Sequence, residues 1–310
     1  MSANLARPVI AACVVIVALM SSPLRARDAQ QRTFASPEEA AAALVEAVKG
    51  GQLNDVVALF GPGGRELADS SDAATGRRNR EVFVAAAAEG WRLQDEPGKG
   101  KVLILGREAW PFPVPLVKRA NGWQFDTAAG KEEVLARRIG RNELAVIGVC
   151  RRYVAAQRLY SQHPHDGKPT GLFAQRIASS PGKQDGLYWP PERGQKHSPL
   201  GDLVALAAQE GRPLNTGPLV PQPFHGYSFK ILTGQGAGAV GGAKSYLVSG
   251  DMVAGFALVA WPVQYDATGV MTFVVNQDGV VHQKDLGPST AATASAMAVY
   301  DPGTGWEVAQ

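Results

Sequence analysis

The chain has 310 residues, of which 45% are hydrophobic and 19% are charged, and its formal net charge is +3 at pH 7. This composition is that of an ordinary globular protein of about two domains, which excludes a mostly disordered chain. The net charge is too small to indicate a nucleic acid or an anionic membrane as a partner.

Residues 1–26 are predicted to be a secretory signal peptide. Arg7 provides the positive segment, residues 8–20 form an apolar run, and small or helix-breaking residues follow as far as Ala26. A transmembrane helix needs about 20 apolar residues, so a permanent membrane anchor is the weaker alternative. We expect no stable transmembrane anchor and a periplasmic or secreted protein after removal of the signal peptide.

Removal of the signal peptide also removes Cys13, and Cys150 is then the single cysteine of the mature chain. One thiol forms no intrachain disulfide, so packing has to stabilise the fold in an oxidising compartment. Because Cys150 falls on the apolar side of a predicted helix, we expect a buried and unreactive thiol.

Residues 33–127 are predicted to form an α+β domain. Ser36, Pro37 and Glu39 give three helix-start signals: a capping side chain, a first-turn proline and the second half of a capping box. Helices are expected at 37–49, 53–60 and 78–89, and strands at 91–96, 101–107, 114–118 and 123–125. Helices followed by a strand meander favour the α+β class. Residues 43–60 and the hairpin at 121–126 resemble the nuclear-transport-factor-2-like superfamily, which implies a cone-shaped domain.

A long helix is predicted from Thr127, which can cap it, to about Gln162. From Val146 onward, apolar or uncharged residues recur in steps of three and four: Val146, Ile147, Cys150, Tyr153, Val154, Gln157 and Tyr160. This spacing marks one buried face. If unbroken, about 34 residues at a rise of 1.5 Å give a length of about 50 Å, enough to join two domains.

The same helix is rich in arginine, with Arg137, Arg138, Arg141, Arg151, Arg152 and Arg158. A charged row of this kind is typical of a solvated helix face, and the alternative is a stripe that binds anions. The solvated face is the simpler interpretation, and the sequence leaves both open.

Residues 224–287 are predicted to form an antiparallel sheet. Tyr227, Phe229 and Ile231 alternate with polar residues, the period of a half-buried strand. Further strands are expected at 256–260, 270–275 and 280–285, with the turn Asn-Gln-Asp-Gly at 276–279. We expect the apolar face of the sheet to pack on the long helix in one domain, residues 128–310.

Several motifs resemble the bacterial domain-of-unknown-function 2950 family, and they lie at 125–133, 137–144, 153–160, 185–190, 225–233 and 269–281. This resemblance implies an exported location and brings no established activity. Residues 140–287 are also similar to the globular heads of type IV pilin-like proteins, which implies the fold of the head. Fibre assembly is not implied, because a whole domain and a separate signal precede the helix.

Candidate binding residues gather around a proline-rich segment at 163–223. Asp185, Tyr188 and Trp189 cluster there, and His225 and Tyr227 at the start of the sheet complete the set. Aromatic residues flanked by prolines either pin a long loop to the core or line a binding groove. The five histidines, which are His163, His165, His197, His225 and His282, lie in the second half of the chain, but without a recognisable ligand spacing. Residues 163–166 could offer ligands, with His197 or His225 completing the set, but solvated loop histidines are commoner, and we predict no metal site.

Two short motifs point to catalysis or cofactors only superficially. Gly236, Gly238 and Gly241 fit the spacing of a dinucleotide loop, but a strand-like segment follows where a helix is required. Ser180 and Lys183 have a serine–lysine spacing, but Pro181-Gly182 forbids the helical turn which that chemistry needs. We predict no catalytic residues and no cofactor.

The sequence favours an exported envelope protein of the α+β class that binds or scaffolds without catalysis. Its expected partner is an envelope protein or a small ligand, and not a nucleic acid. The alternative is a periplasmic hydrolase with a site in the N-terminal cone or under the loop at 163–223.

Overall fold

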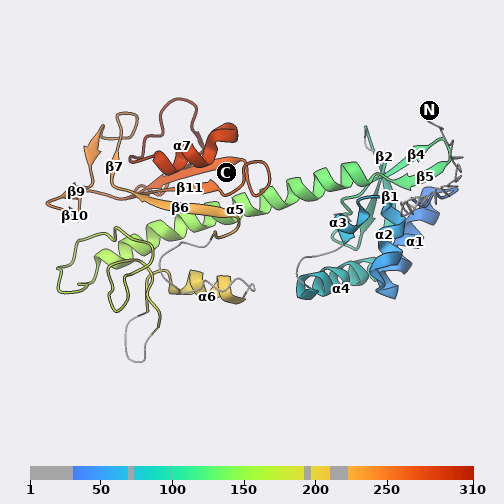
Figure 1. Ribbon diagram of the computed structural model, residues 1–310, viewed down its shortest axis with the longest axis horizontal. Coiled ribbons are helices and arrows are strands. Elements are labelled where there is room, and N and C mark those ends of the chain that lie inside the picture. Colours follow the sequence, from blue (N-terminus) through green and yellow to red (C-terminus); the bar gives the residue numbers. More distant parts are fainter. Residues whose placement is uncertain (1–30, 69–72, 99, 192–196, 210–222) are drawn as a thin grey trace, which may run out of the picture. The chain divides into compact units, whose positions relative to one another are not determined.

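The computed structural model describes residues 31–68, 73–98, 100–191, 197–209 and 223–310. The chain divides into two compact units, one ending at Ala129 and the other beginning at Gly130 (Figure 1). Each unit combines helices with antiparallel strands, which confirms the predicted α+β class. The signal peptide predicted at residues 1–26 lies outside the described residues.

The first unit opens with four helices, α1 (Pro37–Gly50), α2 (Leu53–Phe60), α3 (Gly64–Ala68) and α4 (Ala73–Glu89). At the start of α1, Ser36 Oγ accepts a hydrogen bond from Glu39 N at 3.1 Å, as the capping signal predicts. The Glu39 carboxylate reaches back to Ala35 N at 3.2 Å, one residue before the position that a capping box uses. Helix α4 begins at Ala73 rather than at Arg78.

A sheet covers these helices with strands β1 (Trp91–Glu96), β2 (Gly100–Leu105), β3 (Trp110–Pro111), β4 (Leu116–Arg119) and β5 (Gly122–Phe125). The order is β1-β2-β4-β5, and β3 pairs with β2. Aromatic rings occupy the space between helices and sheet. Phe60 meets Phe125 edge-on at 5.3 Å between ring centroids, and Phe83 meets Phe112 at 5.7 Å. The described interior of this unit is therefore apolar.

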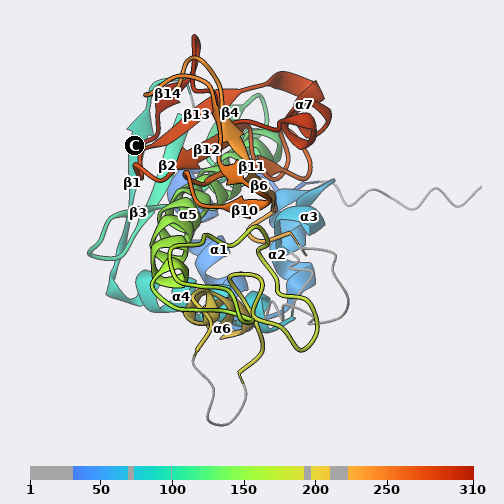
Figure 2. The ribbon, with the colours of Figure 1, turned by 90° about the vertical axis from the view of Figure 1, so that its left-hand side faces the viewer.

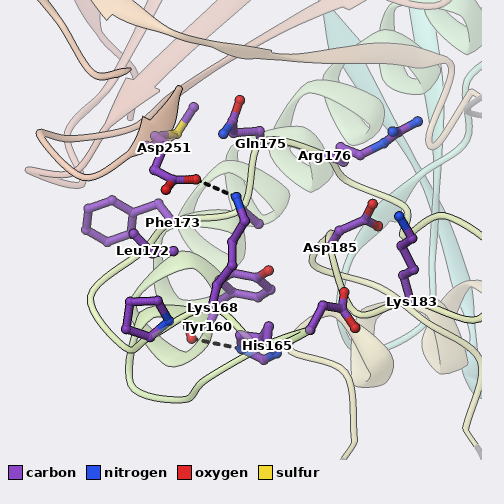
Figure 3. A pocket seen from close by; sticks show the side chains of 14 residues that line it. Tyr160, His165, Lys168, Leu172, Phe173, Gln175, Arg176, Lys183, Asp185 and Asp251 are labelled. Atoms are coloured by element: carbon purple, nitrogen blue, oxygen red, sulfur yellow. Dashed lines mark hydrogen bonds and ion pairs between the residues drawn. The ribbon is translucent and has the colours of Figure 1, made fainter. Parts of the chain in front are cut away.

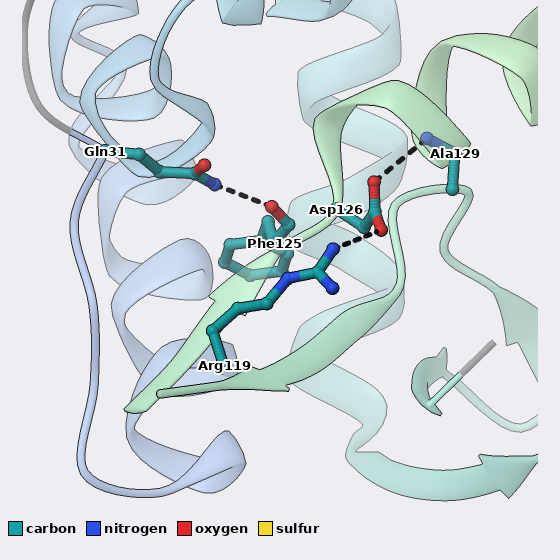
Figure 4. A network of polar contacts seen from close by, with 5 residues as sticks. All are labelled: Gln31, Arg119, Phe125, Asp126 and Ala129. Atoms are coloured by element: carbon teal, nitrogen blue, oxygen red, sulfur yellow. Dashed lines mark hydrogen bonds and ion pairs between the residues drawn. The ribbon is translucent and has the colours of Figure 1, made fainter. Parts of the chain in front are cut away.

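Helix α5 (Thr127–Ser161) starts directly after β5, at a network of polar contacts (Figure 4). Asp126 Oδ1 accepts a hydrogen bond from Ala129 N at 3.1 Å, and Asp126 Oδ2 accepts one from Arg119 Nη2 at 3.1 Å. Asp126 therefore caps the helix, and the prediction that Thr127 does so was wrong. The Thr127 hydroxyl donates to Phe60 O instead.

The second unit contains a five-stranded antiparallel sheet (Figure 2). Its strands are β6 (Tyr227–Leu232), β11 (Ala257–Pro262), β12 (Met271–Asn276), β13 (Val281–Asp285) and β14 (Glu307–Val308), in the order β14-β13-β12-β11-β6. The predicted turn joins β12 to β13: Asn276 Oδ1 accepts from Asp278 N at 3.1 Å, and Gly279 has φ 84°. Two short hairpins interrupt the connection from β6 to β11, β7 (Gly234–Gln235) with β8 (Lys244–Ser245) and β9 (Leu247–Val248) with β10 (Asp251–Met252).

Helices cover both faces of this sheet (Figures 1 and 2). On one face α5 packs as predicted, and the ring of Tyr153 meets Phe256 edge-on at 5.7 Å within a shared core. On the other face lie the 3₁₀ turn η1 (Gly287–Ser289) and helix α7 (Thr290–Ala296). Lys230 Nζ donates to Ser295 O and Met297 O, both at 2.7 Å. Strand β6 is therefore not exposed on its polar side, and Phe229 and Lys230 are buried to a similar, intermediate degree.

Candidate functional site

A cavity of about 680 Å³ opens in the second unit beside the end of α5 (Figure 3). Its wall comes from α5, from the irregular segment that follows it and from β10. The aromatic rings of Tyr160, His165 and Phe173 form part of this wall. Six charged side chains also line it: Asp166, Lys168, Arg176, Lys183, Asp185 and Asp251. Three carry a negative charge and three a positive one, so the cavity is polar but not strongly charged.

Gln157 fixes one wall of the cavity to α5. Its side chain has no exposed surface, its Nε2 donates to Ala174 O at 2.8 Å, and its Oε1 accepts from Ala174 N at 2.8 Å. The amide thus pairs with the backbone of the loop as a neighbouring strand would. One residue earlier, Phe173 N donates to Met252 O at 2.8 Å, which joins the same segment to β10. The wall is therefore held from two sides.

Tyr160 and His165 form a stacked pair, with ring centroids 3.8 Å apart and an interplanar angle of 11°. His165 Nε2 lies 3.0 Å from Tyr160 O, and the Tyr160 hydroxyl donates to Gln184 O at 2.9 Å. Burial, with the charges of Asp166 and Asp185, raises the pKa of Tyr160 to about 12, so its hydroxyl is a neutral donor. Within the described chain, the buried His165 Nδ1 has no hydrogen-bond partner.

Each carboxylate of the cavity already has a partner. Asp185 accepts hydrogen bonds from Ser180 N at 2.7 Å and from Ser180 Oγ at 2.8 Å. Burial raises the pKa of Asp185, but these bonds and the charge of Arg176 outweigh it and hold the pKa below its usual value. Asp166 accepts from Gln184 N at 2.8 Å, while Asp251 forms an ion pair with Lys168.

In contrast to the carboxylates, two cationic side chains of the cavity have no hydrogen-bond or ion-pair partner among the described residues. The side chains of Arg176 and Lys183 are exposed and form no hydrogen bond or ion pair with any residue that the structure describes. Figure 3 shows them beside Asp185, on the same side of the cavity. Neither cation donates a hydrogen bond to Asp185, so both can donate to an anionic group of a ligand, although the charge of Asp185 offsets part of the charge of Arg176.

The structure separates the three candidates of the proline-rich segment. Asp185 lines the cavity, whereas Trp189 is only 5% exposed and belongs to the hydrophobic core. Tyr188 packs against that core, and its N–H donates to Ile177 O at 2.9 Å. The two aromatic residues therefore anchor the loop that carries Asp185.

The structure does not bring His225 and Tyr227 to this cavity. His225 has φ 49°, and its ring lies 4.2 Å from that of Phe224. Tyr227 has no exposed surface, and its hydroxyl donates to Met271 O at 2.9 Å. A binding role for these two residues stays a prediction.

Sequence reasoning missed most of the cavity wall, including Tyr160, Lys168, Arg176 and Asp251. Tyr160 carried a signal only for burial, as a member of the apolar stripe of the long helix. Arg176 lies in an irregular segment and Asp251 in the two-residue strand β10, neither of them within a motif, and Lys168 pairs with a residue 83 positions away. Nothing local in the sequence indicates that these residues meet.

The two superficial motifs have structural explanations. Asp301 Oδ1 accepts a hydrogen bond from Gly238 N at 2.7 Å, and a Cβ added to Gly236 would collide with the Asp301 carboxylate. A carboxylate would repel a phosphate at this loop, so the dinucleotide interpretation fails. Lys183 N donates to Ser180 O at 3.0 Å in a turn, while the Ser180 hydroxyl donates to Asp185, so no serine–lysine pair forms.

Comparisons with known proteins give one finding. A family model described as "Protein of unknown function (DUF2950)" matches residues 31–309. Searches of curated proteins and of solved structures returned no match for the chain. The likeness to pilin-like heads and to the nuclear-transport-factor-2-like superfamily therefore stays a prediction. Within the described ranges, no helix combines the length and the apolar character that crossing a membrane requires, and no group of three or more potential metal-ligating side chains comes together.

Proposed function

The chain belongs to the DUF2950 family, and from this membership and the cavity we propose that it is an exported protein of the bacterial envelope that binds a small anionic ligand without catalysis. The observation that carries the proposal is the cavity of about 680 Å³, in which the carboxylates are engaged and Arg176 and Lys183 are available. Ligand cavities in proteins typically measure about 300–1,000 Å³.

Export is supported by the N-terminal sequence. Arg7, the apolar run at 8–20 and the small residues up to Ala26 have the order of a secretory signal. Mass spectrometry of the mature protein is expected to find its N-terminus between Ser22 and Ala35. A chain that retains Met1 would contradict export with signal removal.

Binding is favoured over hydrolysis by the state of the polar groups. A general base works best with a pKa near the working pH, but hydrogen bonds hold the pKa of Asp185 below its usual value. The Ser180 hydroxyl donates to that carboxylate and not to a histidine. In the first unit, aromatic rings such as Phe60 and Phe125 occupy the interior, which argues against a hydrolase site there.

The ligand is expected to be a small molecule with a carboxylate or a phosphate group. Arg176 and Lys183 can donate charge-assisted hydrogen bonds to such a group. The rings of Tyr160 and Phe173, farther along the wall, offer contact surface to an apolar or planar part of the ligand.

Native mass spectrometry of protein purified from the envelope of its own host tests the proposal. The wild type is expected to carry a small anion that Arg176→Ala with Lys183→Ala loses. Arg92→Ala with Lys244→Ala is a matched control, since both residues are exposed and outside the cavity, and it should retain the anion. A wild type without a bound small molecule, or equal loss in both double variants, would contradict the proposal.

A further inference from the structure

The side of α5 that faces away from the sheet is unusually basic. We call it the arginine face and define it by Arg138, Arg141, Leu144, Gly148, Arg151, Arg152, Ala155, Arg158 and Leu159. The five arginines are exposed. Between Val134 and Ser161 the sequence contains a single acidic residue, Glu143, and its carboxylate is turned to the sheet, where it accepts from Val270 N at 2.8 Å and Met271 N at 2.9 Å. Positive charge therefore gathers on the face although the net charge of the chain is only +3.

These arginines contribute little to the fold. Arg138, Arg141, Arg151 and Arg152 form no hydrogen bond or ion pair with the part of the chain that the structure describes. Only Arg158 makes such a contact, from its Nη2 to Gln277 O at 2.9 Å. Like charges three or four residues apart on a helix, as in Arg138 and Arg141, lower its stability. A purely solvated face would normally intersperse both signs of charge.

An apolar seam runs along the middle of the arginine face. At 100° per residue, Leu144, Gly148, Ala155 and Leu159 follow one line along the helix. Arg141 and Arg152 flank this line on one side, and Arg151 and Arg158 flank it on the other. Leu144 is 65% exposed and Leu159 is 44% exposed. A Cβ added to Gly148 would meet no other atom of the described residues within 4 Å, so the surface is open there.

We propose that the arginine face docks on a membrane surface of anionic phospholipids. Arginine side chains beside an apolar seam are the pattern of a helix that lies in the plane of the membrane interface. The guanidinium groups would pair with lipid phosphates, while Leu144 and Leu159 would enter the headgroup region. A linear polyanion such as a nucleic acid would use the charges but not the exposed leucines. From Arg138 to Leu159 the face extends for about 30 Å, enough to contact several lipids. This proposal is independent of the cavity.

Vesicle co-sedimentation of the full-length gene product tests the proposal. The protein is expected to bind vesicles that contain phosphatidylglycerol and not vesicles of phosphatidylcholine alone, and added salt should weaken the binding. Its N-terminus is first determined by mass spectrometry, because residues 8–20 would bind lipid by themselves if they were retained. All variants are compared with a wild type that has the same N-terminus.

Charge and apolar contributions can be separated by two pairs of substitutions. Arg151→Gln with Arg152→Gln should weaken binding roughly thirtyfold. The matched control Arg77→Gln with Arg78→Gln removes two adjacent exposed arginines from α4 and should change binding by less than about twofold. Leu144→Ser with Leu159→Ser should weaken binding about tenfold and leave the salt dependence unchanged.

Three results would overturn the proposal. The first is equal binding to both kinds of vesicle. The second is an equal loss for the α4 control pair and for the Arg151 and Arg152 pair, which would indicate general charge attraction. The third is an unchanged affinity of the leucine variant together with equally tight binding of a duplex oligonucleotide, which would identify a site for a polyanion. Circular dichroism melting verifies that each variant is folded.

Discussion

Replacing Gln157 with leucine is expected to destabilise the second unit, although leucine suits the apolar stripe in which Gln157 lies. The Gln157 side chain has no exposed surface and forms two hydrogen bonds of 2.8 Å with the backbone of Ala174. It also donates to the Tyr153 hydroxyl at 3.1 Å. Leucine would leave the N–H and the C=O of Ala174 buried without partners, because Ala174 itself is only 1% exposed.

The expected loss follows from two opposing contributions. A buried backbone group without a partner costs about 1–3 kcal/mol, so two of them cost about 2–6 kcal/mol. The apolar leucine side chain returns about 1.5 kcal/mol through its own burial. The free energy of unfolding of the second unit should therefore fall by about 0.5–4.5 kcal/mol. Tyr153→Phe removes the hydrogen bond that the hydroxyl donates to Ala257 O and the one that it accepts from Gln157 Nε2, and it should cost about 1–3 kcal/mol.

Urea denaturation measures the stability, and hydrogen exchange at the Ala174 amide reports the local effect. The control is Gln175→Leu, because Gln175 is exposed and, among the described residues, its side chain donates only to Gly250 O at 2.9 Å. That change should stay within about 0.5 kcal/mol of the wild type. If Gln157→Leu leaves both the stability and the protection of the Ala174 amide unchanged, the amide does not hold the loop.

Three further predictions concern the same unit. Val154→Asp should lower the free energy of unfolding by about 3–5 kcal/mol in a denaturation experiment, because it buries an unpaired charge. Arg151→Asp, on the exposed side of α5, should cost little. Equal losses in the two variants would contradict the packing of the Val154 side of α5 on the sheet. Burial raises the pKa of Cys150 to about 12, so the native thiol should resist labelling at pH 8, and rapid labelling would contradict its position. Burial favours the neutral form of His282 and holds its pKa below the usual value in the folded state. The contribution of neutral His282 to the free energy of unfolding is present above about pH 6.5 and is lost as the pH falls through the folded-state pKa. His282→Gln should reduce the dependence of the melting temperature on pH in this range. An unchanged dependence would show that His282 does not cause it.

Elements with strong local signals could be predicted from the sequence. The turn at Asn276–Gly279 depends on residues that tolerate a positive φ. The two strands that it joins, β12 and β13, pair directly beside it. The buried stripe of α5 could be read from Val146 to Tyr160, because helical spacing repeats within one element. In these cases the decisive interactions lie within a few residues of one another.

Features that depend on distant partners could not be predicted in the same way. The alternation in β6 indicated one solvated face, but Lys230 donates to carbonyl groups 65 and 67 residues further along the chain, around the end of α7. A lysine can cover apolar surface with its stem and place its ammonium group at such carbonyls. At the start of α5, Thr127 and Asp126 both suit a cap, and the position of Phe60 O decided between them by engaging the Thr127 hydroxyl.

One wall of the candidate site was nevertheless indicated by a local feature of the sequence. This feature is Gln157, the polar residue in the apolar stripe of α5. A buried amide has to satisfy its donors and its acceptor, and a helix that is already hydrogen-bonded along its backbone does not offer the partners. Gln157 lies four residues from Tyr153 and three from Tyr160, so its position requires a polar group of another segment to dock beside these rings. The described contacts supply that group from the backbone of Ala174, a residue of the cavity wall. Arg176 carries no comparable constraint, because its exposed charge is satisfied by water wherever the loop places it.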